Sequence, residues 1–215
     1  MTLRSSFLNQ GEICLCGSRI FVHESIYQMF LDKFCKLANE MIVGDPLDEK
    51  TQVGALVSEQ HLNKVLSYIQ IAKEEGGNIL TGGERLGGDL ALGYFLRPTI
   101  VTGLHATESR LQKEEIFGPV VTVTPFSTDE EAVAYANSTE YGLSASVWTR
   151  DVGRAHKIAH ALHVGTVWVN TWMKRDLNLP FGGIKGSGLG REGRHDSIDF
   201  YCEVTLSSFR KRQSH

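Results

Sequence analysis

The stretch Pro119-Val120-Val121-Thr122-Val123-Thr124-Pro125-Phe126 determines the fold class that this sequence predicts. β-Branched residues dominate it, which is typical of a strand buried on both faces of a sheet. Shortly after it, Thr128 and Glu131 have the spacing of a capping box and predict a helix over 129–137. A buried strand followed by a helix is the unit from which parallel sheets are built.

Strand and helix signals alternate on both sides of this stretch. Short apolar or β-branched runs predict further strands at 19–22, 78–81, 95–101, 143–148 and 164–170. Apolar residues at helical spacing predict further helices at 26–41, 58–75 and 152–162. We therefore expect an α/β fold with a largely parallel sheet flanked by helices, and a last extended strand over 200–209.

Composition and charge narrow the functional classes. The 215 residues carry a formal net charge of −3, which gives no electrostatic attraction for nucleic acid or for an anionic membrane. No apolar run is long enough to span a bilayer, and the first residues lack the apolar core of a secretory signal. The four cysteines have no framework spacing, so we expect reduced thiols in a cytoplasmic protein without nucleic acid or membrane partners.

A second stretch, Asn9-Gln10-Gly11-Glu12-Ile13-Cys14-Leu15-Cys16-Gly17-Ser18-Arg19, places a cysteine in polar surroundings. A lone cysteine is usually a small buried apolar side chain. A glycine near a nucleophile, however, lets backbone N–H groups stabilise a developing oxyanion. We therefore interpret Cys14 as a catalytic nucleophile and Cys16 as a packing residue or a minor second thiol. A Cys-x-Cys pair alone does not make a metal site, and no metal is expected.

A third stretch, Lys113-Glu114-Glu115-Ile116-Phe117-Gly118-Pro119, leads directly into the central strand. A charged turn ended by Gly-Pro would explain it without any function. A carboxylate beside a sheet strand, followed by an aromatic residue and a Gly-Pro turn, also suits binding of ribose hydroxyls.

Together these stretches resemble motifs of the aldehyde dehydrogenase superfamily. The cysteine stretch is similar to its Asn-x-Gly-Gln/Glu-x-Cys run, with the Arg five residues later. The stretch before the central strand is similar to its Glu-x-Phe-Gly-Pro element. A fourth stretch, Pro180-Phe181-Gly182-Gly183-Ile184-Lys185-Gly186-Ser187-Gly188, resembles its Pro-Phe-Gly-Gly-x-Lys-x-Ser-Gly segment. The resemblance covers nearly the whole sequence.

The resemblance implies a role for each motif. Cys14 would attack a small aldehyde as a thiolate, and the resulting thioester would be hydrolysed to the acid. Glu115 would bind the ribose of the nicotinamide, Phe117 would line the nicotinamide pocket, and Phe181 would lie at the substrate mouth. NAD or NADP is the implied cofactor.

The resemblance also implies a domain organisation. Residues 1–199 would form the catalytic domain, and residues 200–215 would form an oligomerisation strand and tail that joins a second copy of the chain. Family members carry a dinucleotide-binding domain, a general-base Glu and an oxyanion Asn before the nucleophile, and this sequence has no counterpart of them. We therefore expect an isolated catalytic domain without dehydrogenase activity of its own, with NAD(P) bound mostly by a domain absent from the chain.

The substrate can be narrowed by two details. Glu12 and the run Arg175-Asp176-Leu177-Asn178-Leu179-Pro180 look most like the branch that oxidises 2-aminomuconic and 2-hydroxymuconic semialdehydes. These aldehydes carry a carboxylate, which the guanidinium of Arg175 could bind through two hydrogen bonds. The alternative for Arg175 is a surface salt bridge with Asp176 or another neighbour.

Two other functions remain open at this stage. Without a cofactor, Cys14 could still react with activated esters, which would make the chain a residual thiol esterase. A non-catalytic fragment that dimerises through residues 200–209 is the other alternative.

Overall fold

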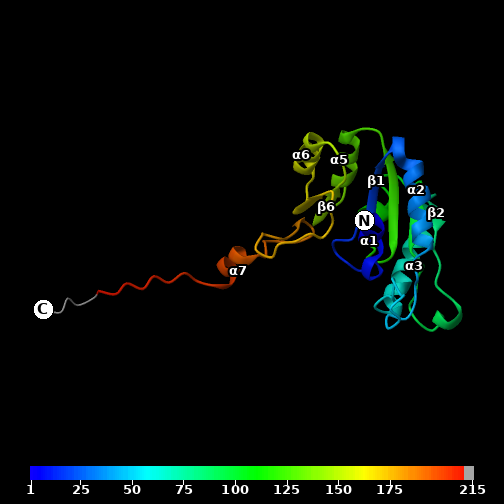
Figure 1. Ribbon diagram of the computed structural model, residues 1–215, viewed down its shortest axis with the longest axis horizontal. Coiled ribbons are helices and arrows are strands. Elements are labelled where there is room, and N and C mark those ends of the chain that lie inside the picture. The colour runs from blue at the N-terminus through cyan, green and yellow to red at the C-terminus, as the bar shows by residue number, and fades with distance from the viewer. Residues whose placement is uncertain (211–215) are drawn as a thin grey trace.

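The computed structural model describes residues 1–210 and has an α/β architecture. Within these residues the main sheet has four strands, in the order β1-β4-β3-β2. The bounds are β1 Arg19–His23, β2 Asn78–Thr81, β3 Thr99–Thr102 and β4 Val120–Phe126. β1 and β3 run parallel to β4 on its two sides, and β2 is an antiparallel edge strand. The expected largely parallel sheet is confirmed (Figure 1).

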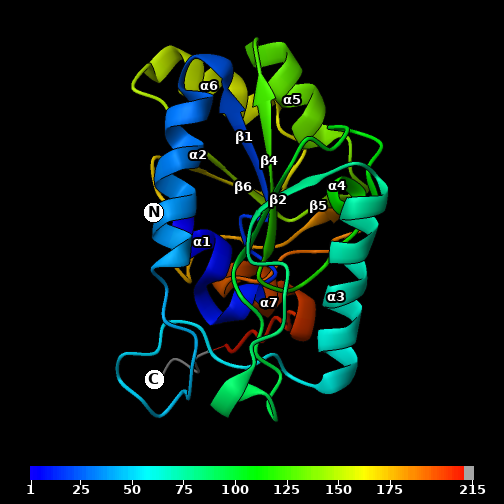
Figure 2. The same ribbon diagram turned by 90° about the vertical axis from the view of Figure 1, so that its right-hand side faces the viewer.

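Two long helices cover opposite faces of this sheet (Figure 2). α2 (Glu24–Asn39) contributes to the core on one face, and α3 (Glu59–Glu74) to the core on the other. Neighbouring residues of β3 point to the two cores, since Ile100 joins the α2 side and Val101 the α3 side. A strand covered on both faces disfavours charged side chains, and this explains the β-branched, uncharged sequence of β4.

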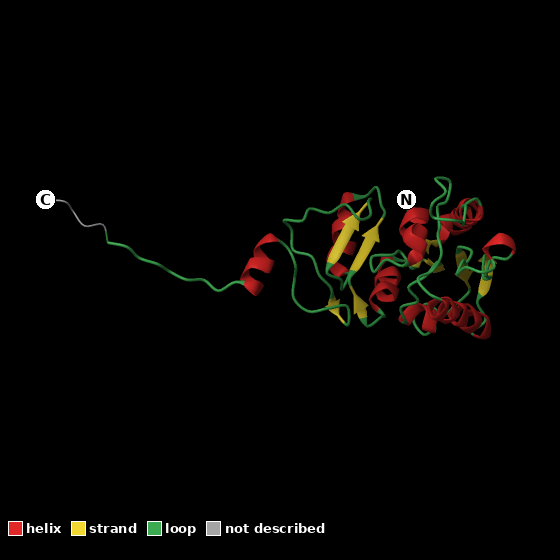
Figure 3. Ribbon diagram, turned by 90° about the horizontal axis from the view of Figure 1, so that it is seen from below, coloured by secondary structure: helices red, strands yellow, loops and turns green. Residues whose placement is uncertain are grey.

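A smaller lobe packs beside the main sheet (Figures 1 and 3). It contains the parallel pair β6–β7 and the antiparallel pair β5–β8. The strands are β5 Tyr141–Gly142, β6 Ser144–Val147, β7 Thr166–Val169 and β8 Ile184–Lys185, and the helices are α5 Asp129–Asn137 and α6 Val152–Ala161. The shorter elements of the described chain are α1 Thr2–Phe7, η1 Leu8–Gly11, η2 Gly88–Leu90, α4 Arg110–Lys113 and α7 Arg194–Tyr201.

Side-chain caps account for the helix starts that the sequence predicts. Ser58 Oγ accepts a hydrogen bond from the third N–H of α3, and Thr128 Oγ1 accepts one from the third N–H of α5. These bonds satisfy N–H groups that have no partner inside a helix. Glu131 completes the start of α5, because its carboxylate accepts the N–H of Ser127 at 2.7 Å.

The prediction of a strand over 200–209 is wrong for the single chain. Phe200 and Tyr201 lie in the last turn of α7, and residues 202–210 have no regular secondary structure and lead away from the body (Figure 1). A strand needs the backbone of a neighbouring strand, and this segment pairs with none in the described chain. Among residues 1–210, no helix combines the length and apolarity needed to cross a bilayer.

Candidate active site

Cys14 lies on a tight loop that follows three residues in the left-handed conformation. Asn9, Gln10 and Gly11 have φ values of 52°, 59° and 71°. The Asn9 amide donates to the carbonyl of Glu12 at 3.0 Å, and the N–H of Cys16 closes the next turn onto the carbonyl of Ile13 at 2.9 Å. The Cys14 thiol is exposed at the tip of this turn.

Gly11 packs backbone to backbone against the stretch that precedes β4. A Cβ atom on Gly11 would lie 2.5 Å from the carbonyl carbon of Gly118 and 3.0 Å from the nitrogen of Pro119. Only a residue without a side chain permits this approach. The contact brings the loop of Cys14 beside the loop of Phe117, although about a hundred residues separate them in the sequence.

The two neighbouring thiols have different surroundings. Cys16 donates its S–H to the carbonyl of Ser6 at 3.1 Å, and burial raises the pKa of its thiol to about 12. Cys14 is exposed. Because the thiolate is the reactive form, Cys16 is poorly suited to nucleophilic attack and has a packing role.

Helix α3 holds residues 114–117 through three polar side chains. Tyr68 donates its hydroxyl to the Glu114 carboxylate at 2.6 Å, Lys64 donates to the carbonyl of Glu115 at 3.0 Å, and His61 contacts the carbonyl of Phe117 at 2.6 Å. His61, Lys64 and Tyr68 have the spacing of one helix face. The apolar spacing that predicts this helix marks only its buried face, so these three residues were not predicted. Their recurrence three and four residues apart is the signal that could have found them.

Glu114 is held at the start of this loop by a second partner. Arg110 donates two hydrogen bonds to its carboxylate, at 2.7 and 2.9 Å. The hydrogen bonds from Arg110, and then the one from Tyr68, lower the pKa of the Glu114 carboxyl to about 2. The carboxylate of Glu114 is therefore ionised and hydrogen-bonded to Arg110 and Tyr68, and it has a structural role in this loop.

Glu115 and Phe117, the two predicted cofactor-binding residues, both have exposed side chains. Phe117 has a φ of 60°, which is uncommon for a residue with a side chain. The bond from His61 to its carbonyl and the close packing of Gly118 hold this conformation. Such strain persists where surrounding contacts enforce it, and it often occurs at functional sites.

A small apolar cluster joins the Cys14 loop to the stretch Pro180–Gly188. Its buried members are Leu15, Trp168 and Trp172, and the partly buried members are Ile13, Leu143 and Phe181. The indole N–H of Trp172 also donates to the carbonyl of Leu15 at 2.8 Å. The residues on both sides of Cys14 therefore belong to the same cluster as Phe181, the predicted residue of the substrate mouth.

Arg175 lies over the ring of Phe181. The centre of its guanidinium is 4.0 Å from the ring centroid, within the range of a cation–π contact. Its Nη2 is 3.4 Å from a carboxylate oxygen of Glu192, and 69% of the Glu192 side chain is exposed. The ion-pair partner is therefore Glu192 rather than the neighbouring Asp176, and an exposed pair of this length is weak.

Arg19, the last residue of the cysteine motif, has a structural role. Its guanidinium donates to the carbonyls of Tyr135 and Ala136, at 3.1 and 3.0 Å, near the C-terminus of α5. Burial lowers the pKa of this guanidinium to about 10. Arg19 thereby ties β1 to the smaller lobe.

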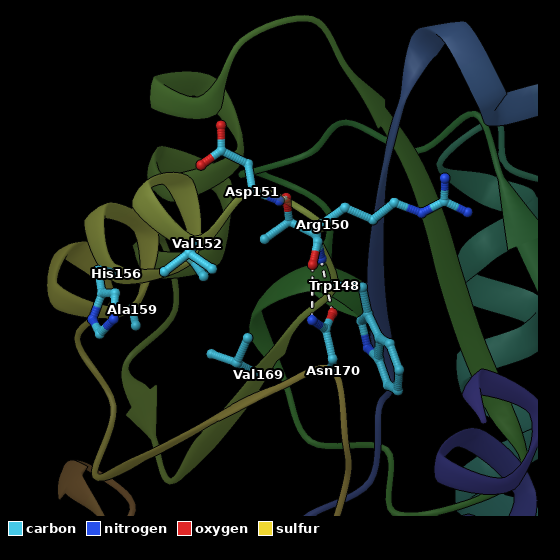
Figure 4. A pocket seen from close by; sticks show the side chains of 10 residues that line it. Trp148, Arg150, Asp151, Val152, His156, Ala159, Val169 and Asn170 are labelled. Atoms are coloured by element: carbon cyan, nitrogen blue, oxygen red, sulfur yellow. Dashed lines mark hydrogen bonds between the residues drawn. The ribbon is translucent and has the colours of Figure 1, made fainter.

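A cavity of about 670 Å³ lies elsewhere, between α6 and the ends of β6 and β7 (Figure 4). Trp148, His156 and Val169 are among its lining residues. At its edge the Asn170 amide accepts the N–H of Thr149 at 3.0 Å and donates to its carbonyl at 2.8 Å. None of the five predicted site residues lines this cavity, so it is separate from the candidate active site. Within residues 1–210, no group of three or more His, Cys, Asp or Glu side chains is placed to hold a metal ion.

Sequence comparisons show which known proteins this chain is similar to. The sequence profile of the aldehyde dehydrogenase family matches residues 1–206. A 2-aminomuconic semialdehyde dehydrogenase of Mus musculus is 52% identical over 207 residues, which are 94% of this chain and 42% of that protein. A 2-aminomuconic 6-semialdehyde dehydrogenase of a Pseudomonas species is 42% identical over 205 residues, with the same two coverages.

Solved structures have the same fold. Betaine aldehyde dehydrogenase of Staphylococcus aureus, solved with NAD⁺, superposes with a TM-score of 0.90 at 37% identity. The match covers 93% of this chain and 40% of that one. The chain thus spans about two fifths of the length of the relatives that it matches. With a profile match over nearly its whole length and a shared fold, this chain belongs to the aldehyde dehydrogenase family.

Proposed function

We propose that this chain supplies the nucleophile and the nicotinamide-facing loop of an NAD(P)-dependent aldehyde dehydrogenase. The observation that carries the proposal is the contact between Gly11 and Gly118. It places the loop of the exposed Cys14 thiol beside the loop that exposes Glu115 and Phe117. A reactive thiol beside a cofactor loop is the arrangement that oxidation of a covalently held aldehyde requires.

Cys14 carries the covalent chemistry in this proposal. Its thiolate adds to the carbonyl carbon, and the carbonyl electron pair moves to the oxygen, which backbone N–H groups of the loop stabilise. Loss of hydride from this adduct restores the C=O bond and leaves a thioester. Water then adds to the thioester carbon, and the thiolate departs as the acid forms.

Glu115 and Phe117 would hold the nicotinamide end of the cofactor. The exposed carboxylate of Glu115 can accept hydrogen bonds from ribose hydroxyls, and the exposed ring of Phe117 can pack against the nicotinamide. When bound, the nicotinamide accepts the hydride. The chain spans about two fifths of its relatives, and we propose that most of the cofactor is bound by a part of the protein outside these residues.

The proposed substrate is a small aldehyde that carries a carboxylate, such as 2-aminomuconic semialdehyde. Relatives with 52% and 42% identity bear the names of dehydrogenases for this class of substrate. Arg175 lies on Phe181, whose apolar cluster includes the neighbours of Cys14. Because its pair with Glu192 is weak, its guanidinium can bind a carboxylate through two hydrogen bonds.

The proposed protein partner is a second copy of the chain, bound through residues 200–209. Phe200, Val204, Leu206 and Phe209 are 79–99% exposed, and such an apolar segment gains stability when it pairs with another surface. We expect dimers or larger oligomers in light scattering after size exclusion, and Leu206→Asp should shift them toward monomers. A monomeric wild-type chain would contradict this part of the proposal.

The proposed chemistry can be tested with an activated ester and with an aldehyde. Mixing the chain with 4-nitrophenyl acetate should give a burst of nitrophenolate and an acetyl adduct on Cys14, detected by peptide mass spectrometry. Cys14→Ala should abolish both. Cys35→Ala, which removes another free thiol, on α2, should change neither.

The outcomes separate the candidate functions. The dehydrogenase assay uses the protein that contains the complete cofactor site. Formation of NADH from a carboxylated semialdehyde, and its loss in Cys14→Ala, would support the dehydrogenase function. Acylation of Cys14 without NADH formation in that protein supports the thiol esterase instead. A nitrophenolate burst in Cys14→Ala as large as that of the wild type would refute the assignment of the nucleophile.

A further inference from the structure

His61 lies where the two loops of the candidate site meet the start of α3. Its backbone N–H donates to the Ser58 cap at 3.1 Å, so the residue has a fixed place in the first turn. The next turn is anchored by Leu62 and Val65, which are 1% and 0% exposed. The imidazole therefore extends from a part of the helix that cannot shift without disturbing the core.

The imidazole contacts both loops through one nitrogen. Its Nε2 is 2.6 Å from the carbonyl oxygen of Phe117, and because that oxygen only accepts, Nε2 carries the proton of this bond. The same Nε2 lies 3.4 Å from Oε1 of Glu12. The side chains of His61 and Glu12 are 14% and 9% exposed, so water competes little with these contacts.

Glu12 connects this nitrogen to the nucleophile. It is two residues before Cys14, and its Oε1 also accepts the N–H of Val57, just before α3, at 3.1 Å. On the other side, the bond to Phe117 holds a residue with a φ of 60°. Lys64 and Tyr68 differ from His61 because their hydrogen bonds reach only the loop before β4.

We propose that His61 is a positioning residue that couples the nucleophile loop to the nicotinamide-facing loop. The inference deepens the proposed function and rests on it. His61 holds the carbonyl of Phe117 and the carboxylate of Glu12 in one arrangement, and thereby sets the position of Cys14 relative to Phe117. Contacting groups of this kind are coupled energetically, so removal of the imidazole weakens the link between the two loops.

The test measures how fast iodoacetamide alkylates each cysteine of the full chain, by peptide mass spectrometry. His61→Ala should change the rate constant of Cys14 by roughly three- to tenfold. The rate of Cys35 should stay unchanged, because Cys35 lies on α2, which packs on the opposite face of the sheet from α3. His61→Gln should restore the wild-type alkylation rate of Cys14. The amide nitrogen of glutamine and Nε2 of histidine are separated from Cβ by the same number of bonds, so the amide N–H can replace the imidazole N–H.

A matched control is His105→Ala. It removes another imidazole beside a glutamate, 3.9 Å from Glu108, at an exposed site. This variant should leave Cys14 unchanged. A Glu12→Ala/His61→Ala cycle should be non-additive in the Cys14 rate constant, because each single change breaks the same contact.

The possible outcomes test the coupling through His61 and the proposed function of Cys14 separately. Equal Cys14 rates in wild type and His61→Ala, or additive effects with Glu12→Ala, refute the coupling. A parallel rise at all cysteines that His61→Gln does not reverse indicates general loosening and also refutes it. Failure of the proposed function is seen separately, as a Cys14 that is not acylated by ester in the wild type.

Discussion

The contact between Gly11 and Gly118 can be tested by adding one methyl group. Gly11→Ala places a Cβ 2.5 Å from the carbonyl carbon of Gly118 and 3.0 Å from the nitrogen of Pro119. It also puts a side chain on a residue with a φ of +71°. The contact atoms belong to the backbone, so they cannot move aside as a flexible side chain would.

The two costs can be separated with a second glycine. Gly76 has a φ of +81°, and a Cβ there meets no atom within 4 Å. Gly76→Ala should therefore show only the conformational cost, about 1–2 kcal/mol. Gly11→Ala adds the cost of overpacking, about 1–3 kcal/mol, for a total of about 2–5 kcal/mol.

Urea denaturation followed by circular dichroism measures this difference. With an m-value of about 2.5 kcal/mol/M, the midpoint of Gly11→Ala should lie about 0.4–1.2 M below that of Gly76→Ala. The ester burst at Cys14 should also fall in Gly11→Ala and persist in Gly76→Ala. Equal midpoints would show that Gly11 contributes only its φ, and the close packing of the two loops would be refuted.

Three further predictions concern single side chains. Arg175→Ala should raise KM for a carboxylated semialdehyde about ten- to hundredfold and change KM for a neutral aldehyde far less. The control Lys174→Ala should leave the ratio of the two KM values unchanged. Equal effects of Arg175→Ala on both substrates in steady-state kinetics would contradict carboxylate binding. At about pH 8, iodoacetamide should modify Cys14 and spare Cys16, because burial raises the pKa of the Cys16 thiol to about 12; comparable labelling in peptide mass spectra would contradict this difference. Hydrogen bonds from a guanidinium lower the pKa of Glu114 from 4.5 to about 2, so its contribution to stability is present above about pH 4.5 and is lost as the pH falls toward 2. Glu114→Gln should therefore lose less stability than the wild type between about pH 7 and about pH 3 in urea titrations, and parallel losses would refute this.

Local sequence signals were sufficient for most of the regular elements. The predicted strand at 19–22 and helices at 58–75 and 129–137 correspond to β1, α3 and α5 within one or two residues. Their signals are caps and apolar periods, which depend on neighbours in the chain. The strand predicted from residue 95 begins only at Thr99, after Pro98, which has no N–H for a ladder.

Signals that depend on a partner were less reliable. Residues 200–209 have the composition of a strand, but a strand forms only beside another, and the single chain offers none there. From the sequence, the ion-pair partner of Arg175 could be Asp176 or another neighbour. In the structure the partner is Glu192, which the β-bridge between Phe181 and Glu192 brings beside Arg175. No short-range pattern encodes such a choice.

The sequence by itself determined the chemical groups and their local presentation. Glycine and asparagine before Cys14 favour the left-handed turns of its loop, and the β-branched run makes β4 a buried strand. These properties follow from the backbone preferences of adjacent residues.

Only the tertiary structure decided which of these groups meet. It packs Gly11 on Gly118, separates the exposed Cys14 from the buried Cys16, and brings His61 between Glu12 and Phe117. The reason is physical: contacts across about fifty to a hundred residues form because two helices bury their apolar faces on one sheet, and that burial involves the whole chain at once.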